Sequence, residues 1–273
     1  MQTLSTLGIA FVAWAGYSAA DHVLHLPASH PVAAIQAPAW NWSGTVARGK
    51  TIEIKGINGD VRATASTGSQ VTVSAVKKGR KSDPESVKIE VVTTDAGVTI
   101  CAVYPGDGKR PNTCESGKDG HMNTKDNDVT VDFTVQVPAG VKFSGQTVNG
   151  SVGTDRLGSD ADVSTVNGDV KVIAAGVVRA NTVNGSVDVS MGRADWTGAV
   201  HLSTVNGSIR ATLPPSFSAT INGSTVNGSI ESEFPLTVQG KFGPRSIHGT
   251  IGSGGRTLDL ETVNGSITLA KGS

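Results

Sequence analysis

A six-residue motif, Thr-Val-Asn-Gly-Ser-Ile with small variations, recurs through the second half of this 273-residue chain. Counted from asparagine to asparagine, with His248 in place of one of them, the copies lie 16 to 22 residues apart. A repeat of about twenty residues is typical of chains whose units stack into an array. The central pairs of the motif are Asn149-Gly150, Asn167-Gly168, Asn184-Gly185, Asn206-Gly207, Asn227-Gly228, His248-Gly249 and Asn264-Gly265, with an earlier relative at Asn58-Gly59.

Each copy predicts two short strands joined by a tight turn. The β-branched residues on both sides favour extended backbone, and Asn-Gly favours a turn because both residues readily adopt positive φ. We therefore expect a positive φ at Gly207. We also expect the valine before each asparagine, such as Val205, to face inward with the β-branched residue that follows the turn. Each fully buried Val or Ile would then contribute roughly 1.5–3 kcal/mol.

Two all-β architectures can be built from this unit. Asn-Gly could be the turn of an antiparallel hairpin in a meander or barrel, or a corner that stacks on itself once per coil of a parallel β-solenoid. The near identity of the copies favours the solenoid, because like residues then stack on like. Stacked asparagine side chains could hydrogen-bond to one another, as amide ladders do in other stacked β structures.

Patterning along the chain predicts four segments. Residues 1–20 resemble a signal peptide, because residues 7–16 are mostly apolar and small residues follow at 18–20. A disordered or membrane-anchored N-terminus is the alternative. Residues 21–43 are an Ala-, Pro- and His-rich linker. Residues 44–146 are a β section with longer, cleanly alternating strands that caps the solenoid of residues 147–273, and residues 44–273 form one continuous domain.

These features predict an exported protein of the periplasm or cell surface, with no transmembrane segment after signal cleavage. The linker histidines His22, His25 and His30 are interpreted as incidental rather than as metal ligands. Lys and Arg together number 23, as do Asp and Glu, so the formal net charge is zero. A nucleic-acid partner is therefore not expected, since such proteins carry a basic surplus or stripe.

The two cysteines, Cys101 and Cys114, bracket a loop rich in Gly and Pro. In an exported protein such a pair favours a disulfide, whereas a zinc site would need two further ligands and only His121 lies near. The acidic loop 115–128 is interpreted as a solvated surface loop. A calcium site is the alternative, but the regular spacing of a calcium-binding loop is missing.

Some β-helices are polysaccharide lyases or hydrolases, which need clustered carboxylates on one face. Asp169 has no carboxylate partner at its own repeat position, and the pairs Glu231/Glu233 and Asp259/Glu261 are ordinary strand-surface patterns. His201 and His248 fall in no catalytic motif. We therefore predict no catalytic residues, no cofactor and no metal. Three or more carboxylates in one groove would favour an enzyme, and a smooth Ser/Thr/Asn face would favour binding.

The motif also carries a resemblance to a known family. Several segments together resemble the bacterial "putative adhesin" β-strand-repeat proteins, a domain of unknown function. They are the recurrent hexapeptide, the run 232–237, the ending 249–252 through 262–267, and the segments 100–105, 111–114 and 131–135. The resemblance covers residues 40–273 and implies a parallel β-solenoid with an exported or surface location. It brings no catalytic residues, and His248 departs from the Asn of the motif.

These observations predict an exported, non-enzymatic β-repeat protein that acts as a structural or adhesion module at the bacterial cell envelope. Its expected partners are envelope glycan or protein. The alternative from another class is a carbohydrate-active β-helix enzyme. A third hypothesis is self-association through the C-terminal coil, because the chain continues only to Ser273 after the last repeat.

Overall fold

The computed structural model describes residues 34–117, 121–238 and 245–272. The predicted signal peptide and linker residues 21–33 lie outside these ranges. Residues 33–273 form one compact unit, which is described here by itself. Within the described residues no helix is long and apolar enough to cross a membrane.

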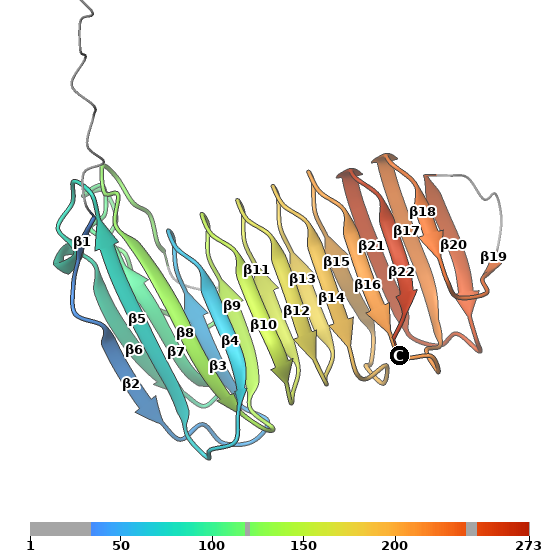
Figure 1. Ribbon diagram of the computed structural model, residues 1–273, viewed down its shortest axis with the longest axis horizontal. Coiled ribbons are helices and arrows are strands. Elements are labelled where there is room, and N and C mark those ends of the chain that lie inside the picture. The colour runs from blue at the N-terminus through green and yellow to red at the C-terminus, as the bar shows by residue number, and fades with distance from the viewer. Residues whose placement is uncertain (1–33, 118–120, 239–244, 273) are drawn as a thin grey trace, which may run out of the picture. The chain divides into compact units, whose positions relative to one another are not determined.

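The described ranges form two eleven-stranded sheets (Figure 1). Sheet A contains β1 (Ile35–Gln36), β2 (Trp40–Gly44), β4 (Val61–Ser66), β5 (Val71–Gly79), β8 (Thr130–Pro138), β10 (Val152–Leu157), β12 (Val170–Ala174), β14 (Val187–Met191), β16 (Ile209–Leu213), β18 (Ile230–Ser232) and β22 (Ile267–Lys271). Sheet B contains β3 (Thr51–Lys55), β6 (Lys88–Thr94), β7 (Gly97–Val103), β9 (Lys142–Gln146), β11 (Ala161–Ser164), β13 (Val178–Asn181), β15 (Ala199–Ser203), β17 (Ala219–Asn227), β19 (Thr237–Val238), β20 (Ser246–Ile251) and β21 (Thr257–Asn264). A single 3₁₀ turn within these ranges, η1, spans Pro84–Ser86.

Successive coils place one strand in each sheet. The chain passes from β9 in sheet B to β10 in sheet A, then from β11 to β12 and from β13 to β14. The strands of neighbouring coils pair in parallel, so the prediction of an all-β fold with parallel strands is confirmed and the hairpin meander is wrong for the repeats. Antiparallel pairs occur near the two ends of the sheets, at β1, β2, β5 and β8, at β6 and β7, and at β17, β19 and β20.

The Thr-Val-Asn-Gly motif is the corner that takes the chain from sheet B to sheet A. At each corner after that of Asn58, the asparagine side-chain amide donates to the asparagine side-chain carbonyl of a neighbouring coil at 2.7–2.8 Å. The ladder runs through Asn58, Asn149, Asn167, Asn184, Asn206, Asn264 and Asn227. Because every rung repeats the same bond, the ladder fixes one register for all of these coils.

The corner valines do not face inward as expected. Val205 is 39% exposed, and its counterparts in the other Asn-containing copies of the repeat half are 37–55% exposed. The threonine before each valine is buried instead: the side chain of Thr204 donates to the Gly185 carbonyl at 2.8 Å, so its hydroxyl is satisfied. The core is formed by residues after the turn, such as Ile209, packed against the inward residues of sheet B.

The expectation of positive φ at the corner glycines is wrong at Gly207, although it holds at Gly59, Gly150, Gly185 and Gly265, whose φ values are 119°, 158°, 156° and 158°. Gly207 has no φ in the left-handed region, and neither do Gly168 and Gly228. The requirement for glycine is close packing, because a Cβ at Gly207 would meet the backbone carbonyl of Gly185 in the neighbouring coil. The corners approach so closely that a hydrogen atom is the only side chain that fits.

The last coil of the chain is not the last coil of the stack. Strands β21 and β22, red in Figure 1, lie between β15 and β16 on one side and β17 and β18 on the other. His248 and Gly249, predicted to be a degenerate repeat corner, lie instead within β20, where His248 pairs with Asn222 of β17. The ladder therefore bypasses His248. The C-terminal coil predicted for self-association is therefore not at the end of the stack, where the edge strands are β18 in sheet A and β19 in sheet B.

Three aromatic rings close the core near this end. The rings of Trp196 and Phe217 lie 5.8 Å apart, and those of Phe217 and Phe234 lie 5.7 Å apart. The guanidinium of Arg256 stacks over Trp196, and the ammonium of Lys271 lies over Phe234. This cluster shields the aliphatic core from water where the narrow repeats end.

Replacement of Ile209 by Ala should destabilise the protein by about 2–5 kcal/mol, because the side chain is 1% exposed and its removal leaves a cavity. The matched variant Val205→Ala should change stability by less than about 1 kcal/mol, because that side chain is partly in solvent. Denaturant unfolding of both variants tests the assignment. Equal losses would contradict the outward placement of the corner valines.

Gly207→Ala should destabilise the stack, because the added methyl group meets the Gly185 carbonyl. Gly153→Ala is the matched control, since the nearest atom to its new methyl would be the Lys171 carbonyl oxygen at 3.8 Å. Thermal unfolding should show a lower Tm for the first variant alone. A Gly207→Ala variant as stable as the control would show that the corner can widen without loss.

Candidate functional site

The outer face of sheet B carries a row of polar side chains in register. Side chains alternate along each strand, so Ile52 and Ile54 enter the core while Glu53 points outward. Parallel and antiparallel pairing then aligns one outward residue from each following strand. In spatial order the row is Glu53, Ser144, Asp162, Arg179, His201, Asp259, Asn222 and His248, which we call the polar row.

A cleft of about 310 Å³ lies at one end of the polar row. Its walls are the β6–β7 turn at Ala96-Gly97 and the loop at Ser116-Gly117 on one side, and strands β9, β11 and β13 on the other. Charged residues reach it from several coils, namely Glu53, Lys142, Asp160, Asp162 and Arg179. The cleft is therefore polar and of mixed charge.

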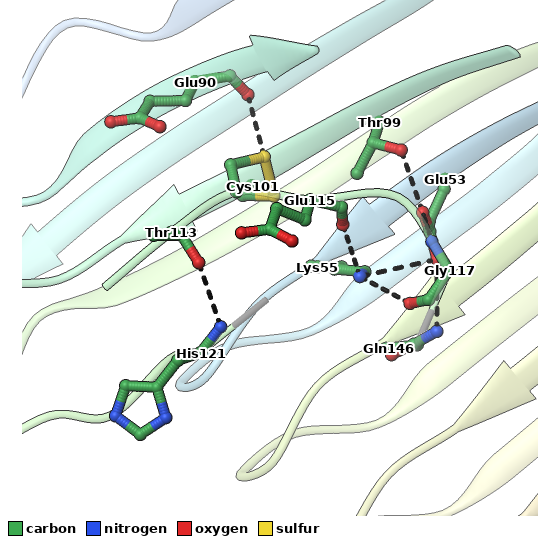
Figure 2. Close-up of a disulfide and its surroundings, with 11 residues drawn as sticks. Glu53, Lys55, Glu90, Thr99, Cys101, Thr113, Glu115, Gly117, His121 and Gln146 are labelled. Atoms are coloured by element: carbon green, nitrogen blue, oxygen red, sulfur yellow. Dashed lines mark hydrogen bonds and ion pairs between the residues drawn. A yellow bond between two sulfur atoms is a disulfide. The ribbon is translucent and has the colours of Figure 1, made fainter. Parts of the chain in front are cut away.

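Glu53, which lines the cleft, forms a buried ion pair with Lys55 (Figure 2). Glu53 is 5% exposed and Lys55 is 6% exposed, and their charged atoms lie 3.8 Å apart. Lys55 donates to the carbonyls of Glu115 and Gly117 at 2.6 Å each. The Glu53 carboxylate accepts from Thr99 at 2.8 Å, from the Gly117 amide at 3.0 Å and from Gln146 at 3.3 Å. This network holds residues 115–117 against sheet B.

A disulfide fixes the start of the same loop. Cys101, on β7, is bonded to Cys114, and their Cα atoms lie 5.7 Å apart. The disulfide prediction is confirmed, and both sulfurs are consequently unavailable as zinc ligands. The cross-link and the Lys55 contacts act on adjacent residues of one loop, which Figure 2 shows side by side. Together they define the wall of the cleft.

The buried Tyr104 side chain is held by two backbone carbonyls. Its hydroxyl lies 2.9 Å from the Val129 carbonyl and 3.2 Å from the Asn58 carbonyl. Burial raises the pKa of Tyr104 far above its ordinary value. The phenol therefore stays protonated at neutral pH and cannot act as a general base, so its role is structural.

Asp128, the last carboxylate of the acidic loop, binds backbone amides of a neighbouring segment. Asp128 accepts from the amides of Ser82 and Lys81 at 2.9–3.3 Å. These bonds, that from Ser82 foremost, lower the pKa of Asp128. Across the described ranges no three His, Cys, Asp or Glu side chains gather closely enough to hold a metal ion.

Three carboxylates, from Glu53, Asp160 and Asp162, line the cleft. The sequence does not indicate this grouping, because Glu53 precedes the repeats. The other two residues lie at and just after a turn that does not carry the repeat motif. Glu53 has the partners given above, and Asp160 accepts from the Val177 amide at 3.0 Å and from Arg193 at 3.2 Å.

The other end of the polar row is a continuous hydrogen-bonded chain across four strands. His201 lies 3.1 Å from the Asp259 carboxylate, Asn222 donates to that carboxylate at 2.8 Å, and His248 lies 2.6 Å from the Asn222 side-chain oxygen. That oxygen can only accept, so His248 Nδ1 is the donor. Sequence analysis found no partner for either histidine, because the insertion of the last coil brings Asp259 beside His201.

The structure and the sequence together define an all-β, solenoid-like repeat protein with a polar outer face. The family model Toastrack DUF4097 matches residues 116–270, and the chain belongs to this family. A search of the curated proteins found no match.

The solved structures that resemble this chain include three bacterial proteins. A "putative cell adhesion protein" from Clostridium sporogenes is 12% identical with a TM-score of 0.45, covering 86% of this chain and 100% of that one. A "putative adhesin" from Bacteroides fragilis is 15% identical with a TM-score of 0.37, covering 85% and 97%. A "putative adhesin" from Parabacteroides distasonis is 11% identical with a TM-score of 0.25, with the same coverage.

Lys55→Met should destabilise the protein by roughly 3–5 kcal/mol, because it leaves the buried Glu53 carboxylate without its counter-charge. It should also release residues 115–117 to proteolysis. Lys171→Met, at an exposed position on sheet A, is the control and should change stability by less than about 0.5 kcal/mol. Denaturant unfolding and limited proteolysis measure both effects, and a stable, protease-resistant Lys55→Met variant would contradict the anchoring role.

Proposed function

We propose that this protein is an exported, non-enzymatic binding module of the bacterial cell envelope, located in the periplasm or at the cell surface. Membership of a family matched along residues 116–270 supports this assignment. The Cys101–Cys114 disulfide supports export, because such bonds persist in oxidising compartments. The partner that we propose is an envelope glycan or protein, bound on the outer face of sheet B.

The observation that carries the proposal is the in-register polar surface of sheet B. Neighbouring strands lie about 4.8 Å apart, so donors and acceptors are presented at a regular spacing along the polar row. A second outward row follows two residues further along each strand: Gln146, Ser164, Asn181, Ser203, Glu261, Ser224 and Ser246. An extended polar ligand could contact successive strands of this surface at once.

Binding is favoured over catalysis by the state of the carboxylates in the cleft. A general acid or base must exchange a proton with the substrate. The oxygens of Glu53 are already occupied by three donors beside Lys55, and Asp160 is held by Val177 and Arg193. Glu53 and Asp160 therefore serve the fold, and the exposed Asp162 shares the cleft with hydroxyl, amide and cationic side chains that can meet a ligand.

The finer architecture is part of the same proposal. We infer that one Thr-Val-Asn-Gly-Ser corner per coil defines the repeat unit of a parallel β-solenoid. Residues 44–146 then act as the cap at one end, because their antiparallel strands cover the edges that the first coils would expose.

The alternative function is a carbohydrate-active enzyme of the lyase or hydrolase type. The observation in its favour is the presence of Glu53, Asp160 and Asp162 around one cleft. Asp162 would be the first candidate for a catalytic role, because it is exposed on β11.

The test is an envelope pull-down and glycan array with the mature protein, residues 21–273, with released sugars measured in the same samples. Arg179→Ala should weaken retention by about tenfold or more, as expected for loss of a charged hydrogen bond. Arg210→Ala is the control, an exposed arginine on the outer face of sheet A. Equal binding by both variants would exclude the cleft end of sheet B as the ligand-binding surface.

The same samples distinguish binding from catalysis. Retention without released sugar supports the binding module. Release of sugar by the unmodified protein, abolished in Asp162→Asn, would establish the enzyme and overturn the proposal.

A further inference from the structure

The order of the coils in space differs from their order in the chain. After β16 the chain skips one layer, forms β17 and β18, adds β19 and β20 at the end of sheet B, and then returns to fill the skipped layer with β21 and β22. We call residues 257–271 the inserted coil and the layer that they fill the slot.

Both sides of the slot pair with the inserted coil in parallel register. In sheet B, β21 pairs with β15 from Ala199↔Thr257 to Ser203↔Glu261, and with β17 on its other edge. In sheet A, β22 pairs with β16 and with β18. Without the inserted coil, these four strands would expose unpaired backbone groups on the facing edges, which is the condition under which strand edges recruit another strand.

Side chains match the slot as well as the backbone does. Leu258, Leu260, Ile267 and Leu269 are 0% exposed between the neighbouring coils. Thr262 donates to the Gly207 carbonyl on one side, and Thr225 donates to the Gly265 carbonyl on the other, both at 2.8 Å. Asn264 occupies the rung of the ladder between Asn206 and Asn227. The slot is therefore specific for a segment that carries this motif.

The inserted coil is joined to the preceding strand by residues 252–256, which contain three glycines. Gly252, Gly254 and Gly255 have φ values of 61°, 72° and 105°, a region that other residues rarely adopt. This connection passes the start of β17, where Ser218 accepts from Arg256. A glycine-rich hinge of this kind allows the coil to follow more than one path from β20.

We propose that the inserted coil can be exchanged between two copies of this protein. In the exchanged dimer, residues 257–271 of each copy fill the slot of the other, with the same pairs and the same buried residues as within one copy. The association is symmetric and closed, because each copy donates one coil and accepts one. The monomer and the exchanged dimer differ in the path of residues 252–256. The dimer is favoured as the protein concentration rises.

The exchange has a consequence for the outer face of sheet B. Asp259 belongs to the inserted coil, whereas His201 and Asn222, its hydrogen-bond partners, belong to the strands that flank the slot. Each polar row of the dimer would therefore combine residues of both copies. This consequence does not depend on which ligand the surface binds.

The experiment uses two full-length variants, Ser203→Cys and Glu261→Cys, whose residues are paired across the slot. The two are unfolded with the native disulfide intact, mixed, refolded at several total concentrations, and treated with a short bismaleimide cross-linker. Covalent dimers should form. While dimer is the minor species, a tenfold rise in protein concentration should raise the ratio of dimer to monomer about tenfold.

Two controls make the result decisive. The pair Asp162→Cys and Arg179→Cys is in the same kind of register between coils that follow one another in the chain, and its mixture should give no concentration-dependent dimer. A chain carrying both Ser203→Cys and Glu261→Cys should cross-link within itself at low concentration. If that chain cross-links while the mixture gives no more dimer than the control pair at any concentration, the exchange is refuted.

Discussion

The close approach of backbones at the Asn-Gly corner is the constraint on which the other features of this fold depend. A Cβ at the motif glycine would meet the carbonyl of the neighbouring coil, so glycine is required by distance. The same distance brings each asparagine amide within 2.7–2.8 Å of the next asparagine. Once the corners are stacked, the strands on both sides have no freedom of register, because a shift by one residue would move every core side chain to the surface.

The sequence predicted the strands, the corners and their parallel stacking because these follow from local preference and near-identical repetition. It did not predict which corner side chain faces inward, because Thr and Val are similar in size and shape. The difference lies in the hydroxyl of Thr204, which finds the Gly185 carbonyl only in the stacked structure. His248 was misassigned for a related reason: Ser-Ile-His-Gly-Thr-Ile resembles the motif, yet the segment pairs antiparallel with β17.

The candidate site was harder to predict than the fold, because its residues are brought together by register between distant segments. Glu53 and Asp162 face one cleft because β3 and β11 both pair with β9. His201 meets Asp259 only because a coil from the end of the chain enters the stack. A single residue in the sequence does not indicate which distant residue it will contact in the fold. The disulfide was predictable, because Cys101 and Cys114 are the only cysteines in the chain.

The position of the inserted coil also determines when folding can finish. A growing chain emerges N-terminus first, and coils stacked in chain order could each be added as they appear. Here the core between β15 and β17 stays open until residues 257–271 have emerged, because no earlier strand of the described residues occupies that layer. The stack is thus completed only when residues 257–271 are present, and a chain cut short before them would expose unpaired strand edges in place of a closed surface.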